Sequence, residues 1–436
     1  MEYEYGSPEA APAPGQISAP QNEVKPPFSA SASEKIAALA MYLLAYCYVR
    51  MWSETEYGRV LLCAFTLGFV ALTEYLHRRT ARSRESWVWL GCVAALLLSI
   101  VLDRCRAWDN GEPMLLLHVF AVWWVLSRSG TLLEGESGHL LPADALDGFV
   151  IFPFGHFPLR LRCLAAAVGA WRGERKKLSA VTAVWTVLAL AFAAALLVTA
   201  ANLLMAADRG FADLLDGLVG QLGWEWDSWR LIELLLSLPV GAYLFGLIAG
   251  TAREDRSRLR ARGEGVKDTL VQFRQVPRAV WTAMAALFCV LYCAFFVVQG
   301  SYLFGAFTRS LPDGFVVAEY ARQGFFELCK VMAVNFALLW LVTRTSRPEG
   351  NSDRGVKALC LVLLGQSLLF AVIALSKLAL YIDCFGFTPK RLQSSWLVCV
   401  LGCGCICAAV SLLSGKKTMR VWMMFGAVTL ALLCLY

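Results

Sequence analysis

The sequence predicts an all-α, polytopic bundle of transmembrane helices that follows a disordered N-terminal tail. Of the 436 residues, 58% are hydrophobic and only 17% are charged, whereas a soluble domain is about 45–50% apolar and about 25% charged. The mean hydropathy is +0.57. Continuous apolar runs of about 20 residues recur, which is the length that a helix needs to cross a bilayer. Because these runs do not alternate with polar residues, they indicate helices and not the strands of a membrane barrel.

Residues 1–34 form the predicted tail, which we expect on the cytoplasmic side. Six of the fifteen prolines lie there, among alanine, serine, glutamine and five glutamates. This composition cannot bury a core, so we expect disorder. No apolar stretch follows Met1, and the tail is therefore not a signal peptide.

Residues 35–436 form the predicted transmembrane helical domain, for which apolar length indicates about eleven spans. The fourth span is the shortest, because Pro113 and Arg128 bound it. The expected spans are 36–53, 58–77, 87–104, 114–128, 178–206, 229–251, 280–304, 325–344, 356–382, 392–413 and 418–436.

A long segment at 129–177 separates the fourth and fifth spans. Its aromatic stretch at 149–158 predicts an interfacial or re-entrant segment. The following stretch at 159–177 is apolar in the middle and has arginine and lysine at its ends. This pattern is typical of a helix that lies on a membrane surface.

The distribution of lysine and arginine predicts the orientation. If the four arginines at 78–84 are cytoplasmic, alternation places the other basic segments on the same side and leaves the acidic loop 207–228 outside. These basic segments are 128–177, 252–279, 344–357 and 416–420. We therefore expect a multi-pass protein of the cell membrane with a cytoplasmic N-terminus and an external C-terminus. The same topology explains the net charge of +7, so the sequence does not favour a nucleic-acid partner.

Two stretches at the predicted outer face carry charges beside apolar runs, where each charge costs a few kcal/mol unless it is paired or hydrated. Gly386 and Thr388 predict a helix end, a tight turn and a new helix start. Lys390 and Arg391 then fall in the first turn of that helix, where the dipole favours anions. The predicted binding residues are Arg322, Glu327, Lys330, Lys377, Tyr381, Asp383, Thr388, Lys390 and Arg391.

Two interpretations of these charges stay open. Counting Glu319 as well, the two stretches hold five basic and three acidic residues, and the excess positive charge could receive a phosphate or carboxylate. Alternatively, the charges form an internal salt-bridge network that clamps the helices, with lysine tips reaching the interface.

Metal and cofactor chemistry find no framework in the sequence. The four histidines, at 77, 118, 139 and 156, are scattered, and His118 is expected to be a hydrogen-bonded packing residue. Most of the fifteen cysteines lie in apolar runs, where they pack as small apolar groups. Cys105 and Cys384, near span ends, are the one pair to test for a disulfide. No cofactor is predicted.

Two short stretches carry a family resemblance. They contain Tyr320, Arg322 and Gly324–Leu328 in the first, and Tyr381, Phe385–Thr388 and Arg391 in the second. In these residues the chain resembles the bacterial membrane proteins of domain of unknown function 4173 and the related family 4153. It departs from them at Lys377, where the family pattern has arginine, and at Phe387, where it has leucine. The resemblance implies a bacterial inner-membrane protein but no activity, although some members are loosely linked to two-component signalling.

Three functional hypotheses follow. The first is a protein that binds or translocates an anionic small molecule or lipid group at the outer face. The second is a regulatory or structural subunit, because the basic loop 252–279 suits a soluble cytoplasmic partner or anionic membrane lipids. The third is a membrane-embedded transferase that uses Glu327, but without a catalytic motif the sequence favours a role other than an enzyme.

Overall fold

The computed structural model confirms the all-α class, because the described residues form helices and no strand. It describes residues 28–53, 57–104, 111–172, 228–308, 325–347 and 353–435, with scattered positions between 189 and 211. The predicted span 178–206, the acidic loop 207–228 and most of the predicted tail therefore lie largely outside the described residues.

The N-terminal half is a helical bundle around one apolar core. Its long helices are α1 (Ala32–Ser53), α2 (Gly58–Leu76), α3 (Arg84–Val101), α4 (Glu112–Ser129) and α10 (Ser228–Arg253). Short elements follow α4, namely α5 (Leu141–Leu146), the π-helix η1 (Asp147–Ile151), α6 (Phe152–Gly155) and α7 (Leu159–Arg172). The core includes Trp89, Phe120, Trp124 and Phe245, all nearly inaccessible to solvent.

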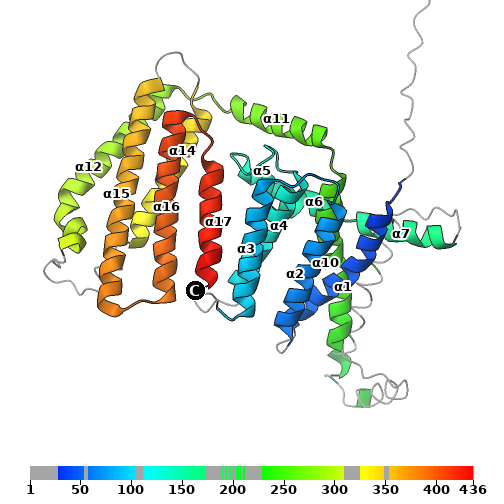
Figure 1. Cartoon of the computed structure of the whole chain (residues 1–436). Helices are drawn as coiled ribbons and strands as arrows, with labels where there is room; N and C mark the ends of the chain where they lie inside the picture. The colour runs from blue at the N-terminus through cyan, green and yellow to red at the C-terminus, as the bar shows by residue number, and fades with distance from the viewer. Residues whose placement is uncertain are drawn as a thin grey trace, which may run out of the picture.

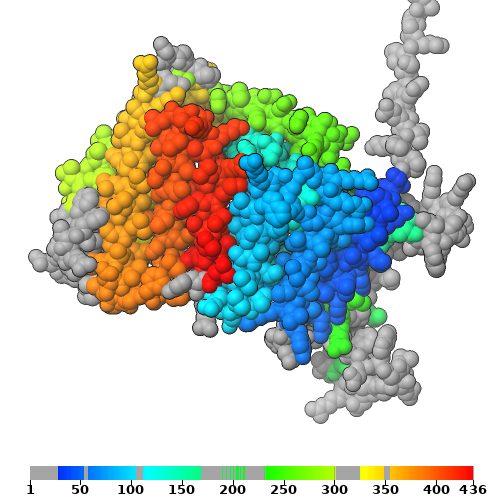
Figure 2. Space-filling view, viewed as in Figure 1, coloured from blue at the N-terminus to red at the C-terminus, as the bar shows by residue number. Residues whose placement is uncertain are grey.

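The C-terminal half has its own apolar core, built around Phe370 and Met332. Its helices are α12 (Arg278–Thr308), α14 (Phe325–Thr345), α15 (Asp353–Phe385) and α16 (Pro389–Ser414). The last helix, α17 (Met419–Leu435), packs against both α16 and α3. Figure 2 shows α17 in red between the orange and cyan helices, where it joins the two halves.

Nine segments in the described part of the chain are long and apolar enough to cross a membrane. Eight of them correspond to predicted spans, and the ninth is Leu141–Ala167. That segment is broken into short helices, and α7 lies crosswise to α1 and α10 (Figure 1). α4 and α17 also match predicted spans, although α17 has only 17 residues. The chain is thus a multi-pass membrane protein.

The basic segments gather at one end of the molecule. Figure 1 shows the α2–α3 and α16–α17 connections and helix α11 (Arg256–Gln272) at this end, and the α15–α16 turn at the other. The predicted topology places the basic segments on one side of the membrane, and these segments lie at one end of the structure. The assignment of this end to the cytoplasm stays a prediction.

The turn between α15 and α16 follows the sequence closely. Gly386 takes the left-handed conformation at φ +77°, and its amide donates to the carbonyl of Ile382 at 2.8 Å. Pro389 begins α16 after Thr388, which has an extended N-cap conformation. The Thr388 side chain accepts no hydrogen bond from the first amides of α16, so the expected side-chain cap does not form.

Candidate functional site

The predicted outer-face residues are brought together only in part. The ring of Tyr381 lies 4.1 Å from the guanidinium carbon of Arg391. Arg391 also donates to the carbonyl of Phe385 at 2.9 Å and to that of Gly386. Arg391 therefore closes its own turn. Lys377, two helical turns before the end of α15, is completely buried.

Four other predicted residues take no part in the contact between Tyr381 and Arg391. Glu327, Lys330, Asp383 and Lys390 are exposed. Glu327 and Lys330 share a helix face, but their side chains form no ion pair or hydrogen bond with any residue that the structure describes. Arg322, Glu319 and Cys105 lie outside the described residues, so their predicted roles are not addressed. Cys384 is an exposed free thiol.

A cavity lies between α14, α16 and α17, near the end of the molecule opposite the α15–α16 turn. Its volume is about 460 Å³, within the range of small-molecule sites. We call it the arginine cavity. It is lined by His139, Arg274, Phe336, Leu339, Trp340, Thr343, Arg344, Gly404, Cys407, Ala408, Ser411, Leu412, Thr418, Met419 and Trp422.

Two arginines line the arginine cavity without a salt bridge to any described residue. Glu134 attracts Arg344, but this carboxylate is paired with Lys417. Arg344 is in the last turn of α14, and Arg274 follows α11. Neither guanidinium makes a hydrogen bond or ion pair within the described part of the chain. Burial lowers the pKa of His139, and the charge of Arg344 lowers it further, although Glu134 opposes this change. The cavity lining is therefore positively charged.

Aromatic side chains also line the arginine cavity. The rings of Phe336 and Trp422 stack with centroids 5.5 Å apart, and the Trp422 indole donates to the carbonyl of Val400 at 2.8 Å. Gly404 allows this approach, because a Cβ there would lie 2.9 Å from atoms of both rings. The cavity thus combines cations with an apolar surface.

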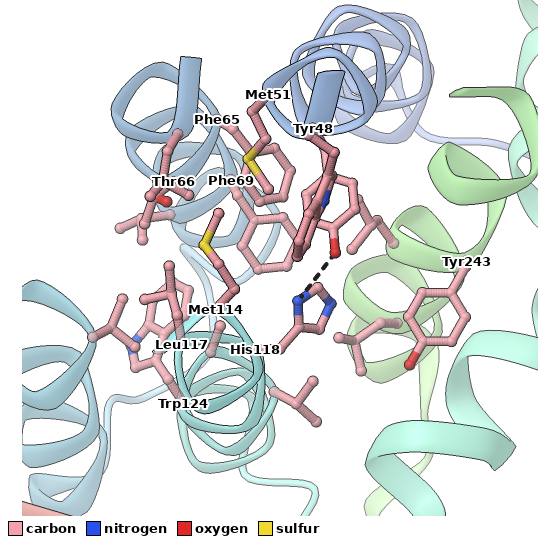
Figure 3. A pocket seen from close by; sticks show the side chains of 18 residues that line it. Tyr48, Met51, Phe65, Thr66, Phe69, Met114, Leu117, His118, Trp124 and Tyr243 are labelled. Carbon is pink, nitrogen blue, oxygen red and sulfur yellow. Dashed lines mark hydrogen bonds between the residues drawn. The ribbon is translucent and has the colours of Figure 1, made fainter. Parts of the chain in front are cut away.

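A smaller cavity of about 40 Å³ lies inside the N-terminal half (Figure 3). The hydroxyl of Tyr48 lies 3.4 Å from Nδ1 of His118, so His118 is hydrogen-bonded as predicted. The side-chain polar atoms of Thr66 and Trp124 belong to residues that line this cavity, and they have no hydrogen-bond partner among the described residues. The volume suits a few water molecules and is too small for a lipid headgroup.

Comparison with protein families adds one result. The model of the family described as domain of unknown function (DUF4153) matches residues 38–436. The chain belongs to the DUF4153 family. This confirms the related family that the sequence indicated, while kinship with domain 4173 and a bacterial origin stay predictions. No curated protein and no solved structure matches the chain.

In this DUF4153 chain, sequence reasoning missed the arginine cavity. Arg274 and Arg344 looked like ordinary cations of cytoplasmic loops, because nothing in their neighbourhoods signals a common site. Residues 276 and 346 bring them together through an isolated backbone bridge between the two loops. Within the described residues, no cluster of histidine, cysteine and carboxylate side chains is suited to a metal ion.

Proposed function

We propose that this membrane protein binds the anionic group of a lipid or another amphiphilic small molecule in the arginine cavity. One observation carries the proposal: Arg274 and Arg344 share a cavity of about 460 Å³, and neither forms a salt bridge with an acidic residue in the described part of the chain. A phosphate or carboxylate between them would relieve their mutual repulsion.

The chemistry of the lining supports an amphiphile over a simple ion. A guanidinium binds phosphate or carboxylate through two parallel hydrogen bonds, which accounts for the polar end. Phe336, Trp340 and Trp422 offer an apolar surface next to it. A ligand with an anionic head and an apolar body would use both parts.

The experiment compares two short-chain lipids that differ in headgroup charge. Phosphatidylglycerol should raise the melting temperature of the detergent-purified protein by a few degrees, whereas phosphatidylcholine of the same chain length should not. Intrinsic fluorescence reports unfolding, because the chain has 15 tryptophans. The double variant R274A/R344A should show a smaller difference between the two lipids than the wild type does.

The matched control is R258A/R260A, which removes two exposed arginines from α11 without touching the cavity. It should respond as the wild type does. An equal response of all three proteins to phosphatidylglycerol would overturn the proposal.

The outer-face cluster is the second candidate place for an anionic group, and binding at both ends would suit translocation. The position of Arg391 beside Tyr381 in the first turn of α16 favours it, because the N-terminus of a helix attracts anions. Binding or flux should fall in Lys377→Ala and Arg391→Ala while the protein still inserts. Loss of stability alone in both variants would favour a clamp.

A regulatory role is the alternative, and the exposure of α11 favours it. Arg256, Arg258 and Arg260 are exposed, whereas Leu259 and Gly263 are the buried residues of this helix. A basic surface of this kind suits a soluble partner or anionic lipids. Affinity capture from native membranes tests this role. A protein that is recovered alone, and whose 252–279 loop is dispensable, would contradict it.

A further inference from the structure

A buried arginine lines a cavity on the other half of the molecule. Arg160 belongs to the first turn of α7, and only 3% of its surface is exposed. The cavity has a volume of about 300 Å³ and lies between α1, α7 and α10. We call it the Arg160 groove. Its lining is Ala38, Leu39, Tyr42, Phe157, Arg160, Leu161, Leu164, Leu238, Pro239 and Ala242.

The hydrogen bonds of Arg160 leave most of its donors unused. Nε donates to the carbonyl of Ala38 and one terminal nitrogen to the carbonyl of Leu238, both at 3.3 Å. A guanidinium has five N–H donors, so three have no partner among the described residues. The guanidinium carbon also lies 5.6 Å from the Tyr42 ring. These contacts position the side chain but do not neutralise it.

No carboxylate near the groove is available to Arg160. The groove lining contains no acidic residue. On α1, Glu34 is paired with Arg253 at 2.9 Å, so its charge is already balanced. A buried charge without a counter-ion is strongly unfavourable. The described part of the chain thus supplies no counter-ion for Arg160, and an external anion would provide one.

A second, independent feature points to the same ligand. Arg160 lies in the first turn of a 14-residue helix, where the dipole favours anions and disfavours cations. Gly241 of α10 makes room for its guanidinium, since a Cβ there would lie 2.5 Å from it.

The rest of the groove is apolar and reaches the surface of the bundle. Leu39 on its wall is 70% exposed, and Leu164 and Leu238 are partly buried beside it. In a membrane protein, such a surface meets acyl chains. A suitable ligand therefore has an anionic group that pairs with Arg160 and an attached hydrocarbon chain that lies in the groove.

We propose that the Arg160 groove holds a phospholipid, with its phosphate on Arg160 and one acyl chain against Leu39, Leu164 and Leu238. This site is separate from the arginine cavity, with which it shares no lining residue. It therefore does not depend on the proposed function.

The test measures lipid retention by native mass spectrometry after reconstitution with long-chain phosphatidylglycerol and phosphatidylcholine. The wild type should retain phosphatidylglycerol. In the R274A/R344A background, which removes the other proposed site, Arg160→Gln should reduce the retained fraction by about tenfold, because charge-assisted hydrogen bonds are lost. In the same background, Leu164→Trp keeps Arg160 but fills the groove, so it should reduce retention even if Arg160→Gln does not fold.

Two controls match these changes. Arg258→Gln removes an exposed arginine from α11, and Leu115→Trp adds an indole on a leucine of α4 that is 67% exposed. Both should retain lipid as the wild type does. R274A/R344A should also keep the groove lipid, so failure of this proposal is distinguishable from failure of the proposed function.

Inorganic phosphate distinguishes a lipid from a free anion. Added alone to delipidated protein, it should not reproduce the thermal stabilisation that phosphatidylglycerol gives. Stabilisation by phosphate equal to that by the lipid would overturn the phospholipid assignment. Wild-type retention by both Arg160→Gln and Leu164→Trp would overturn the site itself.

Discussion

Lys417 Nζ lies 3.2 Å from Glu134 Oε1, although 283 residues separate the two in the sequence. This contact ties the turn between α16 and α17 to the loop that follows α4. Lys267 of α11 approaches the same carboxylate at 3.4 Å, and Arg420 of α17 pairs with Glu136 in that loop. Charged contacts therefore join the two halves of the molecule beside the arginine cavity.

Removing the charge of Glu134 should weaken this junction. Partial exposure of the pair limits the loss from Glu134→Gln to about 1 kcal/mol or less, seen as a small decrease in melting temperature at pH 7. Glu264→Gln, an exposed carboxylate of α11, is the matched control. Equal melting temperatures for wild type and Glu134→Gln would contradict a stabilising contact.

The same junction predicts a pH dependence. Burial alone would raise the pKa of Glu134, but the hydrogen bond from Lys417 and the nearby lysine charges lower it below the ordinary 4.5. A carboxyl with a lowered folded-state pKa contributes stability that is fully present above its unfolded pKa. This contribution is lost as the pH falls through the folded-state pKa. The wild type and Glu134→Gln should therefore converge in melting temperature as the pH falls well below 4.5, and a gap that persists in strong acid would count against this assignment.

Gly404→Ala should fill the part of the arginine cavity that lies beside Phe336 and Trp422. The added methyl would lie 2.9 Å from atoms of Phe336 and Trp422, and the required shift costs about 1–3 kcal/mol. The stabilisation by phosphatidylglycerol should fall to the level seen in R274A/R344A. Gly402→Ala is the matched control, because its Cβ meets its nearest neighbours at an ordinary 3.8 Å. Unchanged lipid binding by Gly404→Ala would show that the aromatic end is not used.

A buried polar network should hold the C-terminal half together. Tyr292 of α12 donates to Asn335 of α14 at 2.7 Å, and Asn335 donates to Ser367 of α15 at 2.8 Å. Asn335→Ala should lower the free energy of unfolding by about 1–2 kcal/mol. Denaturant titration in mixed micelles measures it, and Ser367→Ala should add little in the double variant. Full additivity would mean that the two residues act independently.

The predicted orientation is tested with fusion reporters in a bacterial host. Alkaline phosphatase, which is active only outside the cytoplasm, should be active after Tyr436 and inactive after Gln275. Green fluorescent protein at the same two sites should give the opposite pattern. The reverse result would contradict the cytoplasmic assignment of the basic end.

The sequence predicted those features that depend on local pattern. Continuous apolar runs predicted the helices, and Gly386 with Pro389 predicted the turn between α15 and α16. The helix dipole at the start of α16 led us to expect that Arg391 binds an external anion. Its side chain instead donates to the carbonyls of Phe385 and Gly386 in its own turn. That direction depends on Tyr381, whose ring receives the guanidinium.

Features that depend on contacts between distant segments were not predictable in this way. Arg160 looked like a cation at the end of a surface helix, and its burial depends on the space beside Gly241 in another helix. Likewise, Arg274 and Arg344 share a cavity only because α11 crosses one end of the bundle (Figure 1). The periodicity of apolar residues within one helix does not indicate which residues of other helices it will contact.

An experimental structure in nanodiscs that contain phosphatidylglycerol would test anion binding in the arginine cavity most directly. We predict density for a phosphate between the guanidiniums of Arg274 and Arg344, with the attached chain along Trp422. The same map of R274A/R344A should lack this density. A cavity in the wild type that holds no anionic group, while both guanidiniums pair with carboxylates of the chain, would contradict the proposed function.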